Sequence, residues 1–184
     1  MTLAALTLSV LLALPHPPAE DHARALAEAI ANAAHHSPLW VTGDAGETDG
    51  AIPAGEAATA AVLVGVGYHE SGFLERIARC RYRGLEGDRG RSLGSWQLQG
   101  PVSHGAHNRV TICESDAIQA ERAVAVLMMH RRTGLAGMLH AFASGDAAKP
   151  SRAGRELAAN VAAACRRFGL VCGTTPRWEK GPPG

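Results

Sequence analysis

The chain has 184 residues, a length that suits one domain of ordinary size with a tail at each end. Eighteen basic and seventeen acidic side chains leave a formal net charge of +1, which provides no strong field for capturing nucleic acid. Hydrophobic residues make up 46% of the chain and charged residues 19%, which excludes a wholly disordered polymer. Alanine supplies about a fifth of the residues, so the helices are expected to pack closely through small side chains.

Residues 3–14 are almost continuously apolar and end at a breaker that contains Pro15, Pro17 and Pro18. Twelve helical residues rise about 18 Å, too little for a bilayer core of about 30 Å, so an ordinary membrane span is excluded. The length fits the apolar region of a signal peptide, but no Lys or Arg precedes it and Pro17 stands where a small residue is expected. Three interpretations of residues 1–19 therefore stand: an export signal, a membrane anchor or a helix docked on the domain or on an assembly.

Apolar residues recur with helical periodicity through most of residues 20–174. Helices are expected over five segments: 21–36, 56–80 with a break at GYHESGF, 116–133, 135–142 and 151–168. The second is apolar nearly all round at its middle, which predicts a central, buried helix. Residues 37–55 and 81–105 are rich in turn formers, and SWQLQ within the later segment is expected as a short strand.

These patterns predict one mainly α domain over 20–174 with a small irregular β or loop region after the central helix. A flexible Pro/Gly tail is expected over 175–184.

The four cysteines, at 80, 113, 165 and 172, match no metal-binding spacing and form no C-x-x-C motif. An even number suits two disulfides, and we expect the sequence-local pairs Cys80–Cys113 and Cys165–Cys172 in an oxidising compartment. Four reduced, buried thiols are the alternative. The chain also contains no glycine-rich phosphate-binding motif. We therefore expect neither a metal nor another cofactor.

The segment GYHESGF at residues 67–73 ends the central apolar run and contains Glu70. Burial disfavours the charged carboxylate, and so does the negative end of the helix dipole, so both raise the expected pKa of Glu70. A carboxylic acid that stays protonated near neutral pH is the group with which a glycosidase protonates a leaving oxygen. A glutamate on the exposed edge of the emerging helix is the alternative.

Two short motifs follow each other at this end of the central helix. The first is Glu-Ser at positions 70–71, and the second is the turn GSWQL at positions 94–98. Together they resemble the signature of the goose-type lysozymes and the lytic transglycosylases, a Glu-Ser pair at the end of a buried helix followed by a Gly-x-x-Gln-hydrophobic turn. The likeness covers roughly residues 56–170 and implies a lysozyme-like helical fold.

The resemblance also implies roles for individual residues. Glu70 becomes the catalytic acid, and Asp88, in the glycine-flanked GDRG, becomes the second carboxylate that holds the attacking water in an inverting hydrolase. Without an effective second carboxylate, the substrate's acetamido group assists and its O6 hydroxyl closes an anhydro sugar while Glu70 changes from acid to base. The residues expected to bind substrate, orient the acid or stack on sugar rings are Tyr68, His69, Ser71, Gly94, Trp96, Gln97 and Phe142.

Several positions depart from the family pattern. Gln99 stands where goose-type enzymes usually have an Asp, and Ser95 replaces a hydrophobic residue. In the segment HAFASG, which is similar to the family's A-Y-N-A-G, Phe142 and Ala143 replace the tyrosine and the asparagine. The lost hydroxyl removes a group that would reach the acid, which favours a weak or inactive domain as the alternative.

Two functions are therefore expected from the resemblance. The first is a peptidoglycan-cleaving enzyme, periplasmic, secreted or virion-associated, that cuts the β-1,4 bond between N-acetylmuramic acid and N-acetylglucosamine. The second is a non-catalytic lysozyme-like module that binds glycan or forms part of a phage-tail-like or secretion assembly. In both, peptidoglycan glycan strands are the expected partner and nucleic acid is not. Residues 1–19 leave membrane association open.

Overall fold

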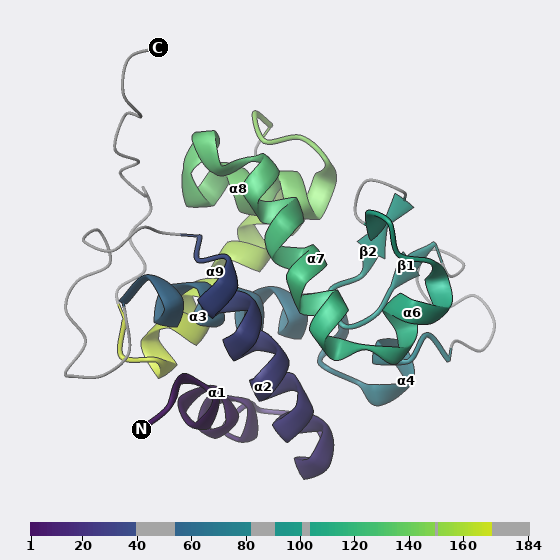
Figure 1. The fold of residues 1–184 in the computed structure, drawn as a ribbon. Coiled ribbons are helices and arrows are strands. Elements are labelled where there is room, and N and C mark those ends of the chain that lie inside the picture. The colour runs from purple at the N-terminus through teal and green to yellow at the C-terminus, as the bar shows by residue number, and fades with distance from the viewer. Residues whose placement is uncertain (40–53, 82–90, 101–103, 150, 171–184) are drawn as a thin grey trace.

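The computed structural model describes residues 1–39, 54–81, 91–100, 104–149 and 151–170 (Figure 1). The helices are α1 (Leu3–Leu12), α2 (Glu20–His36), α3 (Ala54–Ser71), α4 (Glu75–Ala78), α6 (Arg109–Glu114), α7 (Asp116–Met129), η1 (Arg131–Thr133), α8 (Gly134–Ser144) and α9 (Arg152–Arg167). Strands β1 (Ser92–Leu93) and β2 (Leu98–Gln99) form an antiparallel hairpin. The expectation of a mainly α fold with a small β region after the central helix is confirmed. The predicted tail over 175–184 lies outside the described residues.

Helix α3 is the central helix that the apolar run predicts. From Ala57 to Val66, every side chain is at most 4% exposed. Helix α9 packs along one side of α3 and α2 along another. A Cβ atom on Gly65 would lie 2.5 Å from the Cα atom of Val161, so glycine allows α3 and α9 to approach this closely. The helix that carries Glu70 is therefore fixed on several sides by the core.

Helix α1 packs against α2 and α3, and it lies beside α2 at the bottom of Figure 1. Val10 is 4% exposed and Leu11 is fully buried. The guanidinium of Arg167 donates a hydrogen bond to the carbonyl of Ala13, which joins the end of α1 to the end of α9. The three interpretations of residues 1–19 stay predictions. Within the described part of the chain, no helix combines the length and apolar character needed to cross a bilayer.

Local signals place several helix ends where the sequence predicts them. The side chain of Ser115 accepts a hydrogen bond from the backbone of Ile118 at the start of α7, and Ser151 caps α9 in the same way. Gly145 follows α8 in the left-handed conformation that favours glycine. Helix α6 is not predicted from the sequence, because it is short and has no apolar stripe of its own.

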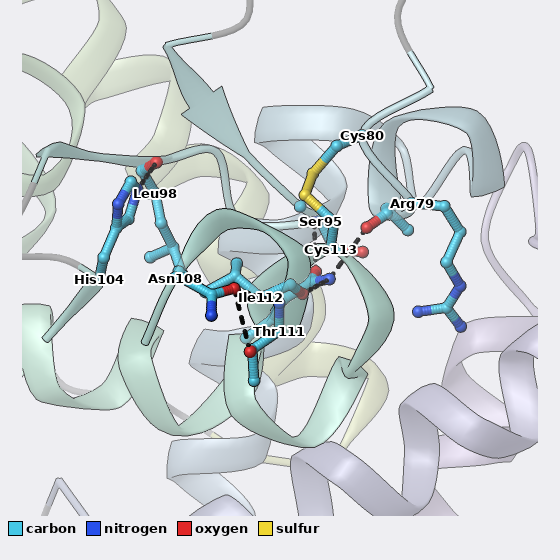
Figure 2. Close-up of a disulfide and its surroundings, with 12 residues drawn as sticks. Arg79, Cys80, Ser95, Leu98, His104, Asn108, Thr111, Ile112 and Cys113 are labelled. Carbon is cyan, nitrogen blue, oxygen red and sulfur yellow. Dashed lines mark hydrogen bonds between the residues drawn. A yellow bond between two sulfur atoms is a disulfide. The ribbon is translucent and has the colours of Figure 1, made fainter. Parts of the chain in front are cut away.

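The expected disulfide between Cys80 and Cys113 is confirmed (Figure 2). It joins the segment directly after α4, which contains Cys80, to α6, which contains Cys113. The second expected pair, Cys165–Cys172, lies outside the described residues because Cys172 does. The bridge closes the long segment between α4 and α6, which contains the hairpin. By constraining the unfolded chain, such a loop closure favours the ordered arrangement.

Candidate active-site pocket

A pocket of about 440 Å³ lies where the end of α3, the hairpin, the end of α7 and the end of α8 meet. Its size falls within the range of small-molecule sites. The described residues that line it are Glu70, Gln97, Leu98, Gln99, Val126, Met129, His130, Ala141, Phe142, Ala143, Ser144 and Gly145. Three residues expected at a site from the sequence, Glu70, Gln97 and Phe142, are thus brought together.

Glu70 is the single carboxylate in the described lining. It lies in the last turn of α3 and is partly buried. Burial raises its pKa from an ordinary value of 4.5 to about 7, because the charged form loses hydration there. Within the described residues, no side chain or backbone group donates a hydrogen bond that would stabilise the anion. A carboxylic acid in this state can deliver a proton near neutral pH.

The end of α3 is fixed by Ser71 rather than left open to a ligand. The Ser71 hydroxyl donates to the carbonyl of Gly67 at 3.0 Å and accepts from the backbone N–H of Phe73 at 3.0 Å. Gly72 and Phe73 both have positive φ angles, so the chain turns sharply directly after the helix. Ser71 is buried and does not line the pocket. Of the two roles expected for Ser71, these contacts fit orientation of the acid, because they hold the turn at the end of α3.

The hairpin turn presents Gln97 to the pocket. Residues 94–97 connect β1 to β2, and Gln97 has a φ angle of 49°, which is uncommon for a residue with a side chain. Its backbone N–H and its side-chain Nε2 both donate to the carbonyl of Gly94, at 3.1 and 2.9 Å. These contacts hold a strained conformation at the pocket wall, and such positions are common at functional sites.

Trp96 is a core residue, so its expected role in stacking on a sugar is wrong. Its side chain is fully buried, and its indole Nε1 donates to the carbonyl of Leu63 at 2.9 Å. Its ring packs edge to face on Phe73, with 5.9 Å between the ring centroids. Trp96 therefore attaches the hairpin to α3 and does not line the pocket.

Gly94 does not line the pocket, and its expected role in letting the turn approach a sugar stays a prediction. Gly94 has a φ angle of 71°, and a Cβ atom there would lie 2.3 Å from the side-chain amide of Gln119. Glycine is needed at this position because the turn lies directly against Gln119 on α7.

Tyr68 and His69 do not line the pocket, and their expected contact with substrate stays a prediction. Successive helical residues point about 100° apart, so neither shares a face with Glu70. Tyr68 packs against the core. His69 faces α9, where its Nδ1 lies 3.2 Å from the side-chain nitrogen of Asn160. Burial lowers the pKa of His69, and the charge of Glu156 opposes this in part.

Several lining residues had no signal in the sequence. His130, directly after α7, and Met129 come to the pocket because α7 packs so that its end lies near the end of α3. The membership of His130 and Met129 depends on packing between distant segments, which no local motif reports. Gln99, which departs from the family pattern in the sequence, also lines the pocket, and its side chain donates to the Ser92 hydroxyl at 2.8 Å.

Asp88, the expected second carboxylate, lies outside the described residues. Among the described residues, no group of three or more His, Cys, Asp and Glu side chains is placed to hold a metal ion.

Comparisons with protein-family models, with curated proteins and with solved structures each return no match.

Proposed function

We propose that the protein is a peptidoglycan-cleaving muramidase, similar to lytic transglycosylases or goose-type lysozymes. It would cut the β-1,4 bond between N-acetylmuramic acid and N-acetylglucosamine, with Glu70 as general acid and base. The observation that carries this proposal is the carboxyl of Glu70, with a pKa of about 7, in the wall of a 440 Å³ pocket beside Gln97. The resemblance of the Glu-Ser and Gly-x-x-Gln motifs supplies the substrate class.

The proposed chemistry begins with protonated Glu70, which donates its proton to the glycosidic oxygen as the bond to the sugar breaks. In an inverting hydrolase, the carboxylate of Asp88 would hold the attacking water on the opposite face of the sugar and take its proton. In an anhydro-forming enzyme, the Glu70 carboxylate would itself take the proton of the substrate's O6 hydroxyl as that oxygen attacks the sugar. The apolar walls formed by Leu98, Phe142 and Ala143 suit the apolar face of a pyranose ring or an acetamido methyl.

Two exposed cations that directly follow the pocket residue His130 in the chain support an acidic glycan as substrate. His130 lines the pocket, and the next two residues, Arg131 and Arg132, are exposed. Within the described residues, neither guanidinium has an acidic partner. Peptidoglycan carries lactyl and peptide carboxylates, which such cations would attract. The disulfide supports the proposal of an oxidising compartment, that is, a location outside the cytoplasm or on a virion.

A second candidate function is a non-catalytic glycan-binding or structural module of a phage-tail-like or secretion assembly. The observation that favours it is the chemistry around the acid. Phe142 and Ala143 line the pocket and supply no polar side-chain group, and no hydrogen bond from the described residues orients the Glu70 carboxyl. A module that binds a glycan without cleaving it needs no oriented acid.

Digestion of purified sacculi, followed by mass spectrometry of the soluble fragments, separates the two functions. We expect fragments from the parent, and a rate lower by on the order of 10²–10⁴-fold from Glu70→Gln, because the amide cannot deliver a proton. Glu75→Gln, on the exposed first turn of α4, is the matched control and should cleave like the parent. Anhydro ends in the fragments indicate the O6 route, and reducing ends indicate hydrolysis.

Two outcomes would contradict the proposed enzyme. Equal cleavage by the parent and Glu70→Gln would remove Glu70 from the mechanism. Retention on sacculi without cleavage by either protein would establish the binding module instead.

A further inference from the structure

A fully buried glutamine, Gln119, lies at the junction of α4, α6, α7 and the hairpin. Its side-chain Nε2 donates to the carbonyl of Ala78 at 2.9 Å and to the carbonyl of Ile112 at 2.7 Å. Its Oε1 accepts from the backbone N–H of Ser95 at 2.7 Å. Both amide hydrogens and the carbonyl oxygen are therefore used, and Figure 2 shows Ser95 and Ile112 together beside the disulfide.

The contact to Ser95 connects Gln119 to the pocket through the hairpin turn. Ser95 is fully buried, so its backbone N–H has no access to water as a substitute partner. Gly94 lies so close to Gln119 that only glycine fits there. The carbonyl of Gly94 in turn accepts both hydrogen bonds that hold Gln97 in its left-handed conformation. Gln97 then lines the pocket with Glu70.

We propose that Gln119 is a positioning residue for the candidate active site: through the turn at residues 94–97, it fixes Gln97 and keeps the hairpin closed beside Glu70. Gln119 itself does not line the pocket, so it acts only through the turn. An apolar side chain at this position leaves the Ser95 N–H without a partner. The turn then moves to hydrate that group, and water reaches the Glu70 carboxyl.

Asp116 supplies a matched control, because it makes hydrogen bonds at the same junction but to Arg79 and not to the hairpin. It lies one turn earlier on α7 and accepts two hydrogen bonds from the Arg79 guanidinium, at 3.0 and 2.7 Å. Burial alone would raise the pKa of Asp116, but Arg79 and the nearby His22 outweigh it and hold that pKa below its ordinary value. Asp116→Asn therefore weakens the packing of α4 on α7 while the contact from Gln119 to Ser95 stays in place.

The test is an NMR titration of the Glu70 side-chain carboxyl in the parent, Gln119→Leu and Asp116→Asn, at a temperature where circular dichroism shows all three folded. We expect the pKa of Glu70 to fall from about 7 towards its ordinary value of 4.5 in Gln119→Leu. In Asp116→Asn it should stay at the parent value. His130 is the other titratable side chain in the described lining, so its resonances are followed in the same spectra.

A second variant covers the case in which Gln119→Leu does not fold. Gln119→Glu in its protonated form can still accept from the Ser95 N–H and donate one hydrogen bond to a carbonyl. It should therefore keep the titration of Glu70 near that of the parent.

A folded Gln119→Leu protein with an unchanged Glu70 titration would overturn the proposal, and so would an equal shift in Asp116→Asn. An altered titration in Gln119→Glu at pH values where residue 119 is protonated would count against it equally.

The KM for peptidoglycan, measured in the same variants, is a second test, and it rests on the proposed function. If the protein cleaves peptidoglycan, Gln119→Leu should raise KM by up to about tenfold, the size of one lost hydrogen bond from Gln97 to substrate, whereas Asp116→Asn should leave KM unchanged. The NMR titration needs no substrate. A shifted titration in a protein that cleaves nothing would therefore retain Gln119 as a positioning residue and reject the proposed enzyme.

Discussion

The Glu70→Gln substitution should increase the stability of the protein, and the increase should depend on pH. The pKa of Glu70 is about 7 in the folded protein, against an ordinary value of 4.5 in the unfolded chain. Because the folded state binds this proton more tightly, the proton's contribution to stability is fully present below pH 4.5 and is lost as the pH rises to 7. The two pKa values correspond to a loss of about 3 kcal/mol. Glutamine has no such proton to lose.

The measurement is urea unfolding of the parent and of Glu70→Gln at a series of pH values from 4 to 8.5. Taking the difference between the two proteins at each pH cancels the titration of every other group. We expect this difference to be small near pH 4 and to grow in favour of Glu70→Gln by about 3 kcal/mol above pH 7. Glu75→Gln, at an exposed position on α4, should show a difference that does not change with pH.

A difference between the parent and Glu70→Gln that stays constant from pH 4 to 8.5 would refute this reasoning. It would mean that the carboxyl is as well hydrated in the folded protein as in the unfolded chain, and the basis for Glu70 as a general acid near neutral pH would be lost.

Three further variants, one of them a double substitution, test other parts of the structure. Trp96→Phe should lower the free energy of unfolding by about 1–3 kcal/mol, because the indole hydrogen bond to α3 is lost, and should leave retention on sacculi unchanged. Replacing both Arg131 and Arg132 with glutamine should weaken retention on sacculi at low salt and reduce its dependence on salt. Leu11→Ala should lower the free energy of unfolding by about 2–5 kcal/mol, because the side chain of Leu11, which belongs to α1, is fully buried in the core.

Each of these has its own control or contrary outcome. If Trp96→Phe folds but no longer binds sacculi, Trp96 would have to be assigned to the glycan-binding site after all. For the two arginines, the matched control replaces Arg24 and Arg166, which are exposed on α2 and α9, with glutamine; an equal effect would mean that net charge alone is responsible. Leu12 is the control for its neighbour, since it is 42% exposed, and an equal cost for Leu11→Ala and Leu12→Ala would argue against the docking of α1.

The amino-acid sequence by itself determined most of the helices, though not α6, and many helix ends, because these depend on neighbours within a few residues. Ser115, Ser151 and Gly145 are capping residues whose hydrogen bonds or backbone conformations are local, and each lies where the sequence predicts a helix end. The apolar run before Glu70 likewise predicted a buried helix and, with it, the raised pKa of that carboxyl.

Only the tertiary structure decided which residues share the pocket with Glu70. Trp96 and Gln97 are adjacent in the same motif, yet the first is in the core and the second lines the pocket, because the turn presents them in different directions. Gln119 belongs to α7, and it reaches Ser95 only because α7 packs against the hairpin. His130 directly follows α7, and it lines the pocket only because the end of α7 lies near the end of α3. A motif records the spacing of residues along the chain, whereas pocket membership depends on contacts between segments that lie far apart in it.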